Sequence, residues 1–272
     1  MHTVSSICPF CGVGCGMGLR VEHNRVVAVE PVPNHPVSQG KLCAKGWNTA
    51  FGIDPEQRIT QPLKRQGHDF VPVSWAKALD DIAEQLRDIL ANDGSQTVGV
   101  ISCARATNED NYALQKFARA VLQTHNIDHC ARICHSPSVA GLAQTLGSGA
   151  MTNSMADVDH ADLIVIWGAD VTENHAILGG RIIQAKLNGA KLIVVDPRST
   201  CLAKLADLHI PLHLGSNIAL ANGLLHIIFR EGWQASSFLA ERVEGLDRLQ
   251  AHVTAWTPEQ VQRETGVTTE LL

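Results

Sequence analysis

The sequence has few charged residues and no long apolar run. Only 18% of its 272 residues are charged, whereas soluble domains usually have about 25%. No hydrophobic segment reaches the roughly 18 residues that a membrane-spanning helix needs. Hydrophobic residues nevertheless make up 45% of the chain, which excludes a disordered polypeptide and allows a sizeable core. The low charge predicts that part of the surface is covered by something else.

Basic clusters and a leader segment are also missing. The 22 Lys and Arg residues against 27 Asp and Glu give a net charge of −5, and no basic block stands out, so a nucleic-acid groove is not expected. The first residues, MHTVSSICPF, contain no basic region, apolar core or twin arginine. We therefore expect a cytoplasmic protein, in which eight unevenly spaced cysteines are more typical of metal binding than of disulfides.

Periodicity along the chain predicts an α/β fold. Alternating apolar residues over 19–29, with His23-Asn24 in the middle, indicate a hairpin, and residues 58–73 are a second extended segment. From Ser74, a plausible N-cap, apolar residues recur at helical spacing. Strands are then expected at 97–103, 163–167, 191–195 and 208–212, and helices at 108–124, 175–188, 216–230, 246–252 and 258–263. This alternation predicts a doubly wound, mainly parallel sheet with flanking helices.

Four of the eight cysteines form the strongest motif, Cys8-x2-Cys11-x3-Cys15, followed by x27 and Cys43. Three thiolates so close in sequence can surround one compact inorganic core, which suits a cubane 4Fe-4S cluster with one cysteine on each iron. A zinc site is the alternative, but structural zinc sites usually have two cysteine pairs. We therefore predict a small iron–sulfur β subdomain over residues 1–58, followed by an α/β region over 59–272.

A second cysteine motif reads Cys130-Ala-Arg-Ile-Cys134-His135. Cys134 comes just before Ser136-Pro137-Ser138, a pattern typical of a helix start, where a thiolate is well placed to bind a metal. The neighbouring His135 could move a proton. A small buried hydrophobe is the alternative interpretation of such a cysteine.

Together these motifs resemble the molybdopterin oxidoreductases. The match runs from the four cysteines and Cys43-Ala-Lys-Gly46 through CARICHSPSVAGL, WGADVTENH, VVDPRST and GSNIAL, and it covers essentially the whole chain. The Cys134-His135 pair, with Cys130-Ala-Arg before it, is similar to the catalytic (alpha) subunit of formate dehydrogenases. The resemblance implies a 4Fe-4S cluster, a molybdopterin guanine dinucleotide with molybdenum or tungsten, and oxidation of formate to carbon dioxide or the reverse reaction.

The resemblance also implies roles for individual residues. Cys134 would be the protein ligand to the metal, and His135 would assist transfer from the formate carbon. Lys45 would lie on the electron path between cluster and pterin; an ordinary exposed lysine is the alternative. The cluster ligands would be Cys8, Cys11, Cys15 and Cys43. The pterin dinucleotide would contact Arg105, Gly168, Asp170, Glu173, Asn174, Asp196, Arg198, Gly215 and Asn217, most of which follow predicted strands.

Family members of this type continue for several hundred residues more. The resemblance thus implies a chain truncated after its N-terminal portion, which would need a further polypeptide to complete the site and an electron-acceptor protein to take the electrons. The alternatives are a non-catalytic electron-transfer or assembly subunit, an inactive fragment, or a zinc-binding module. Cys103 and Cys201 are expected to be packing residues.

Overall fold

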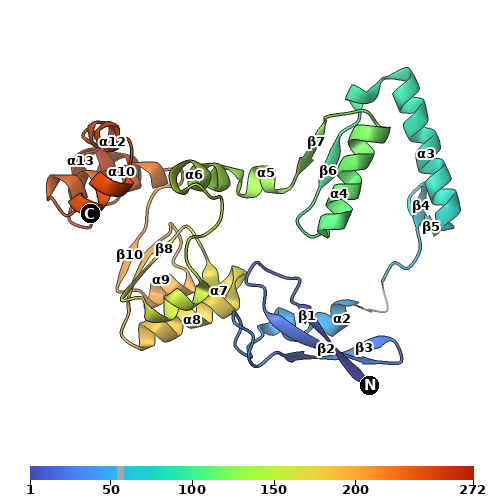
Figure 1. Ribbon diagram of the computed structural model, residues 1–272, viewed down its shortest axis with the longest axis horizontal. Helices are drawn as coiled ribbons and strands as arrows, with labels where there is room; N and C mark the ends of the chain where they lie inside the picture. The colour runs from blue at the N-terminus through green and yellow to red at the C-terminus, as the bar shows by residue number, and fades with distance from the viewer. Residues whose placement is uncertain (54–57) are drawn as a thin grey trace. The chain divides into compact units, whose positions relative to one another are not determined.

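The computed structural model describes residues 1–53 and 58–272, which form two compact units (Figure 1). The first unit comprises Met1–Arg20, Ala28–Asn48 and Asn153–Leu272, and the second comprises Val21–Val27 and Thr49–Thr152. Within the described ranges, no helix combines the length and apolar character needed to cross a bilayer.

The N-terminal strands form a three-stranded sheet in the order β1-β2-β3. These strands are β1 (His2–Ile7), β2 (Gly16–Glu22) and β3 (Arg25–Pro31). His23 and Asn24 have φ values of 47° and 62°, as a two-residue type I′ hairpin turn requires. The predicted hairpin is therefore confirmed. Two short helices follow, α1 (Ala44–Trp47) and α2 (Thr49–Ile53).

A parallel sheet in the order β10-β9-β8 forms the core of the first unit. Its strands are β8 (Leu163–Trp167), β9 (Lys191–Val195) and β10 (Leu208–Ile210). The run of apolar residues predicts strands that are buried on both faces. In β9, Leu192 and Val194 are fully buried, whereas β8 buries Ile164 and Ile166 and leaves Leu163 and Val165 exposed. The register pairs Trp167 with Val195 and Val195 with Ile210, so the carboxyl ends of the three strands are level.

Helices cover this sheet and extend the first unit towards the C-terminus. They are η3 (Met155–His160), α7 (Val171–Asn174), α8 (Ala176–Leu187), α9 (Cys201–Leu205), α10 (Asn217–Arg230), α11 (Ser236–Arg242), α12 (Leu246–Val253) and α13 (Pro258–Thr265). Ile182 of α8 packs with the strands, and Leu220 of α10 packs with Val261 of α13. The helices predicted at 175–188, 216–230, 246–252 and 258–263 are confirmed to within two residues.

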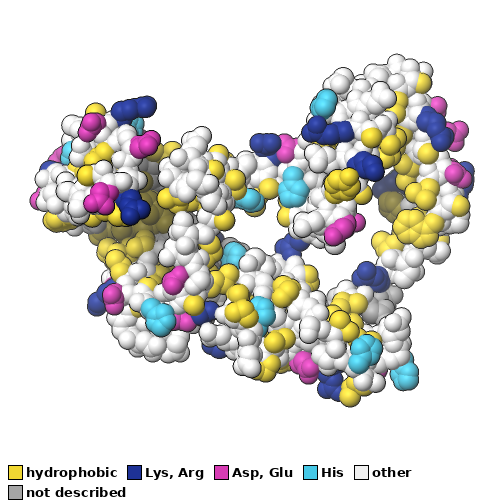
Figure 2. Space-filling view, viewed as in Figure 1, with side chains coloured by type: hydrophobic (Ala, Val, Ile, Leu, Met, Phe, Trp, Pro, Cys, Tyr) yellow, Lys and Arg dark blue, Asp and Glu magenta, His cyan; other side chains and the backbone are white. Residues whose placement is uncertain are grey.

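The second unit contains a hairpin, a long helix and a βαβ element. Its parts are β4 (Leu63–Gln66), β5 (Asp69–Pro72), α3 (Trp75–Asn92), η1 (Ser95–Thr97), β6 (Val100–Ser102), α4 (Asn108–Lys116), η2 (Phe117–Val121), β7 (Ile127–His129), α5 (Ala131–Cys134) and α6 (Ser136–Leu146). Ser74 caps α3 by accepting the Lys77 N–H at 3.2 Å, as predicted. Hydrophobic side chains of α3, including Trp75 and Leu79, reach the surface (Figure 2, upper right).

The α/β class with parallel strands is confirmed, but the strands pair differently from the prediction. Among the described residues, β6 and β7 hydrogen-bond only to each other, separately from β8, β9 and β10. The strand expected at 97–103 is limited to Val100–Ser102, and the helix expected at 108–124 ends at Val121 after a π-helical turn. Periodicity identifies strands, but it does not identify which strands pair.

Candidate functional site

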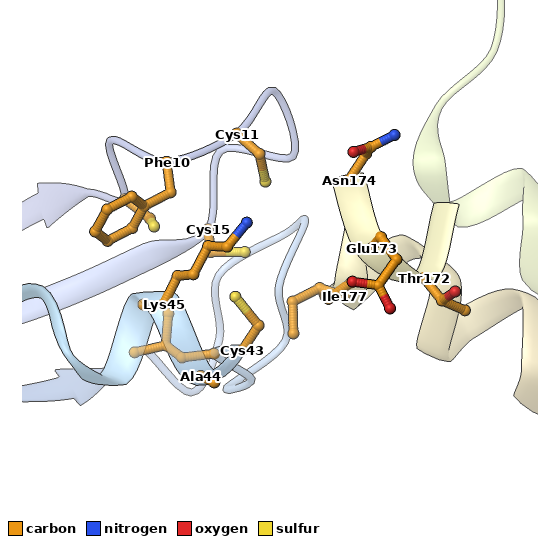
Figure 3. A pocket seen from close by; sticks show the side chains of 14 residues that line it. Phe10, Cys11, Cys15, Cys43, Ala44, Lys45, Thr172, Glu173, Asn174 and Ile177 are labelled. Carbon is orange, nitrogen blue, oxygen red and sulfur yellow. The ribbon is translucent and has the colours of Figure 1, made fainter. Parts of the chain in front are cut away.

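The four clustered cysteines line one cavity of about 180 Å³ in the first unit (Figure 3). The Cys8 N–H donates to the Cys15 carbonyl at 2.8 Å, and this hydrogen bond joins the end of β1 to the start of β2. Cys11 lies in the loop between these strands, and Cys43 is the N-cap residue of α1. The fold therefore brings Cys43 to the three cysteines that are near one another in sequence.

Burial dominates the electrostatics of these thiols. Burial is the largest cause that raises the pKa of the Cys8 thiol, and burial together with the neighbouring cysteines raises the pKa of the Cys15 thiol to about 11. Because a thiol that binds a metal must lose its proton, both sulfurs need a nearby positive charge before they ionise. A cationic iron core in the cavity would supply this charge, so the donor set fits an iron–sulfur cluster.

The cavity is larger than a single zinc ion needs. Zinc binds thiolates at about 2.3 Å. A space of about 10–15 Å³ already holds one water molecule, and this cavity has about 180 Å³. Within the described ranges, no three His, Cys, Asp or Glu side chains are spaced to hold one ion. The cavity, which the four cysteines line together with other residues, has room for a compact group of several atoms.

The other wall of this cavity carries polar side chains from α7. Figure 3 shows the Lys45 side chain of α1 extending towards the sulfurs of Cys11 and Cys15, with Glu173 and Asn174 on the facing helix. Two residues predicted to contact the pterin, Glu173 and Asn174, thus line the same cavity as the predicted cluster ligands. An ammonium and a carboxylate beside one redox site can adjust its local charge.

Six more of the predicted residues lie at the carboxyl edge of the β10-β9-β8 sheet. Gly168 and Gly215 have φ values of +63° and +83°, and no described atom beyond their chain neighbours lies within 4 Å of an ideal Cβ there. This edge is where nucleotide ligands bind in sheets of this kind. The glycines and the open space above them fit a pterin dinucleotide. The other four are Asp170, Asp196, Arg198 and Asn217.

Intramolecular contacts already engage several of these edge residues. The Asp196 carboxylate is almost fully buried, and its Oδ1 accepts the Arg198 N–H at 2.8 Å and Arg198 Nε at 3.3 Å. This contact raises the pKa of the Arg198 guanidinium. Asn217 Oδ1 accepts the Trp167 indole N–H at 2.6 Å, which joins the end of β8 to the start of α10. Sequence reasoning missed the Trp167 contact, because nothing in the local pattern pairs these two residues.

The remaining predicted residues, Arg105, Cys134 and His135, lie in the second unit. Cys134 is exposed and ends α5, and α6 begins at Ser136, so the helix start predicted there is confirmed while α5 was not predicted. The His135 N–H donates to the Ala131 carbonyl at 3.1 Å, which fixes the backbone between the two helices.

The packing role expected for Cys103 and Cys201 is wrong, since both side chains are exposed. Cys103 directly follows β6, and Cys201 is the first residue of α9. β6 has three residues and α9 has five, and residues at the ends of such short strands and helices lie at the surface.

Two protein-family models match the chain. The Molybdopterin oxidoreductase Fe4S4 domain matches residues 1–51, and Molybdopterin oxidoreductase matches residues 58–267. The chain is 45% identical over 269 residues to the F420-dependent formate dehydrogenase subunit alpha of Methanocaldococcus jannaschii, covering 99% of this chain and 39% of that protein. It is 41% identical over 274 residues to formate dehydrogenase H of Escherichia coli, covering 98% and 38%.

The fold is also similar to that of a solved structure. Acetylene hydratase from Pelobacter acetylenicus superposes with a TM-score of 0.80 at 25% identity, over 98% of this chain and 37% of that chain. The chain thus spans about two fifths of the length of the relatives that it matches. The family matches cover most of the sequence and include the four cysteines that line the cavity, and the chain therefore belongs to the molybdopterin oxidoreductases.

Proposed function

We propose that this chain is the cofactor-binding part of a formate dehydrogenase catalytic subunit and acts with a further polypeptide. The observation that carries the proposal is the convergence of Cys8, Cys11, Cys15 and Cys43 with Lys45 on one cavity. Relatives named formate dehydrogenase, at 41–45% identity, support formate as the substrate and carbon dioxide as the product, or the reverse.

The family carries a 4Fe-4S cluster and a molybdopterin cofactor. When bound, these groups supply one-electron transfer and two-electron chemistry, respectively. We assign the four cavity cysteines as the cluster ligands and Cys134 as the ligand to molybdenum or tungsten. The carboxyl edge of the β10-β9-β8 sheet would hold the guanine dinucleotide, with Asp196, Arg198 and the backbone at Gly168 and Gly215 as contacts. For Arg105, the pterin contact rests on the sequence resemblance alone.

The chain's own residues would handle the proton and the local charge. Oxidation of formate yields carbon dioxide, one proton and two electrons, and we assign the proton to an imidazole nitrogen of His135. Lys45, on the cavity wall beside the cysteines, would offset negative charge on the thiolates along the electron path. Glu173 faces the same space and would keep the cavity polar.

The domain division and the location in the cell belong to the same proposal. A cluster subdomain over residues 1–58 and a pterin-binding region over 59–272 are supported by the two family matches, which change between residues 51 and 58. The clustered cysteines support a reducing, cytoplasmic location. An electron-acceptor protein is required because formate releases two electrons and one cluster stores one.

A non-catalytic electron-transfer or assembly subunit that holds only the cluster is the second candidate, and the separate match of the Fe4S4 domain over residues 1–51 favours it. Metal analysis of anaerobically purified protein separates the candidates. Iron with acid-labile sulfide plus molybdenum or tungsten supports the catalytic proposal, iron and sulfide alone support the second candidate, and zinc alone contradicts both.

Replacing the proposed metal ligand tests the catalytic role. Cys134→Ala is expected to abolish formate-dependent dye reduction while iron content stays constant, because the cluster ligands are unchanged. Cys201→Ala is the matched control, since Cys201 is also exposed and has no assigned role. Unchanged turnover in Cys134→Ala contradicts the assignment of Cys134. A wild type that holds both cofactors and its copurifying polypeptide but is inactive contradicts the catalytic proposal.

A further inference from the structure

Two exposed cysteines that the proposed function does not use follow neighbouring strands of the second unit. Ser102 and His129 are the last registered pair of β6 and β7, so Cys103 and Cys130 come next on parallel strands. The Cys130 N–H donates to the Ser102 carbonyl at 3.2 Å, which continues the ladder. Neighbouring strands lie about 4.8 Å apart, and the Cα atoms of disulfides lie about 4.4–6.8 Å apart. The backbone therefore places the two cysteines within bonding reach.

The side chains confirm that the two thiols share one turn. Cys130 Sγ accepts the Ala104 N–H at 3.3 Å, and this nitrogen is bonded to the carbonyl carbon of Cys103. Cys103 Sγ accepts the next amide, the Arg105 N–H, at 3.4 Å. Both are free, exposed thiols. Both sulfurs therefore contact consecutive backbone amides of the same turn.

A base stands beside one of the two thiols. His129 Nδ1 lies 3.8 Å from Cys130 Sγ and accepts the Ala131 N–H at 3.1 Å. Since Nδ1 accepts the Ala131 N–H, it is the unprotonated ring nitrogen, and the Cys130 S–H can share this acceptor. An adjacent base activates a thiol as a nucleophile. Cys130 is thus suited to attack a disulfide as the nucleophile, and Cys103 is placed to attack the mixed disulfide that results.

We propose that Cys103 and Cys130 form a redox modification site that closes as a reversible disulfide. The Cys130 thiolate attacks one sulfur of a small-molecule disulfide such as oxidised glutathione, whose S–S bond breaks and releases one thiolate. The Cys103 thiolate then attacks the Cys130 sulfur of the mixed disulfide and releases the second thiolate. Two protein thiols are oxidised, the reagent is reduced to two thiols, and the cysteine protons pass to the leaving thiolates.

The bond would connect two segments that carry proposed site residues. Cys103 begins the loop that contains Arg105, and Cys130 immediately precedes α5, which ends at Cys134. Closure would restrain both segments, and this consequence rests on the proposed function. The formation of the disulfide does not depend on it.

Peptide mapping of the intact chain tests the site. Anaerobically purified protein is incubated with oxidised glutathione, the remaining thiols are alkylated, and unreduced peptides are identified by mass spectrometry. We expect a linked peptide pair joining Cys103 to Cys130 that disappears after treatment with a reducing dithiol. A bond from Cys130 to Cys134, glutathione retained without an internal bond, or two unmodified thiols would overturn the proposal.

Variants assign the two roles. Cys103→Ser should trap glutathione on Cys130, and His129→Gln should slow modification of Cys130 by about tenfold, because the base is lost. Cys201→Ser, at an exposed cysteine of the first unit, should change neither the linkage nor its rate. Failure of Cys103→Ser to accumulate the mixed disulfide would contradict the roles, whereas the wild-type mapping stands regardless of how the variants fold.

Discussion

At the scale of single residues, the backbone next to Cys15 depends on a glycine. The Gly16 N–H donates to Ser38 Oγ at 3.3 Å, and the His35 ring occupies the space that a side chain would need. An ideal Cβ at Gly16 would lie only 2.4 Å from His35 Cδ2. Ser38 is buried, and its N–H lies 3.4 Å from His35 Nδ1. Ser38 therefore holds the backbone next to Cys15, which is a proposed cluster ligand.

Gly16→Ala is expected to destabilise the chain by about 1–3 kcal/mol, because His35 must move in a packed region. The variant should also retain less iron than the wild type. Denaturant unfolding and iron analysis measure the two effects. Gly12→Ala is the control, since its Cβ would lie 3.8 Å from His175 Nε2, an ordinary contact. Equal losses in both variants would contradict the steric argument.

At the scale of elements, the close approach of α7 and α8 sets one wall of the cysteine cavity. An ideal Cβ at Gly179 of α8 would lie 2.9 Å from the Cα of Thr172 in α7. Gly180, the next residue of α8, has open space around the same position. The backbone of α7 carries Glu173 and Asn174, so the small residue at 179 fixes where these side chains enter the cavity.

The two neighbouring glycines provide a matched pair of variants. Gly180→Ala should stabilise the chain by about 0.5–1 kcal/mol, because alanine favours a helix. Gly179→Ala gains the same propensity but should be net destabilising by about 1–2 kcal/mol, because it pushes against backbone. Denaturant midpoints compare them. A Gly179→Ala variant with a higher unfolding free energy than the wild type would show that α7 can move away from α8 without loss of stability.

A carboxylate joins α8 to the sheet and makes stability depend on pH. Asp207 accepts Lys186 Nζ at 2.6 Å and the Leu192 N–H at 2.8 Å, with Lys191 Nζ at 3.6 Å. The hydrogen bond from Lys186 is the largest cause that lowers the pKa of Asp207 from 3.8 to about 2. The lowered pKa belongs to the folded state, so the carboxylate stabilises the fold above about pH 4, and this contribution is lost as pH falls towards 2.

Asp207→Asn should therefore flatten the loss of unfolding free energy between about pH 4 and pH 2. Chemical denaturation at a series of pH values measures the slope for both proteins. Asp88→Asn, on the exposed surface of α3, is a suitable control and should leave the slope unchanged. Identical slopes for Asp207→Asn and the wild type would contradict the contribution of this ion pair.

At the scale of the whole molecule, one buried arginine connects the N-terminal cysteine region to the α/β layer of the first unit. Arg181 of α8 donates to the Val37 carbonyl at 3.1 Å and to both carboxylate oxygens of Asp159. Only 5% of its surface is exposed, and the contact lowers the pKa of Asp159. Val37 lies in the segment that leads to Cys43, so this arginine connects α8 to the segment that carries this proposed ligand.

Arg181→Met is expected to cost about 1–3 kcal/mol and to reduce iron retention, because the Val37 carbonyl and the Asp159 carboxylate lose a buried donor. Arg230→Met removes a mostly exposed pair with Glu231 and should cost less than about 1 kcal/mol. Unfolding free energies and iron content of both variants measure the difference. Equal effects would show that Arg181 does not link the two regions.

The sequence determined the local parts of this protein. The strands at 163–167 and 191–195, the turn at His23-Asn24 and the cap at Ser74 follow from periodicity and turn chemistry, which act over a few residues. The four-cysteine motif likewise indicated its chemistry from spacing alone.

Only the tertiary structure decided which distant residues meet. It brought Glu173 to the cavity of the four cysteines, paired Trp167 with Asn217, and set Cys103 beside Cys130 through the register of β6 and β7. Among the residues that the structure describes, it also pairs β6 and β7 in a sheet of their own. These contacts depend on strand pairing and on packing between helices, and both are fixed by the burial of surfaces that lie far apart along the chain.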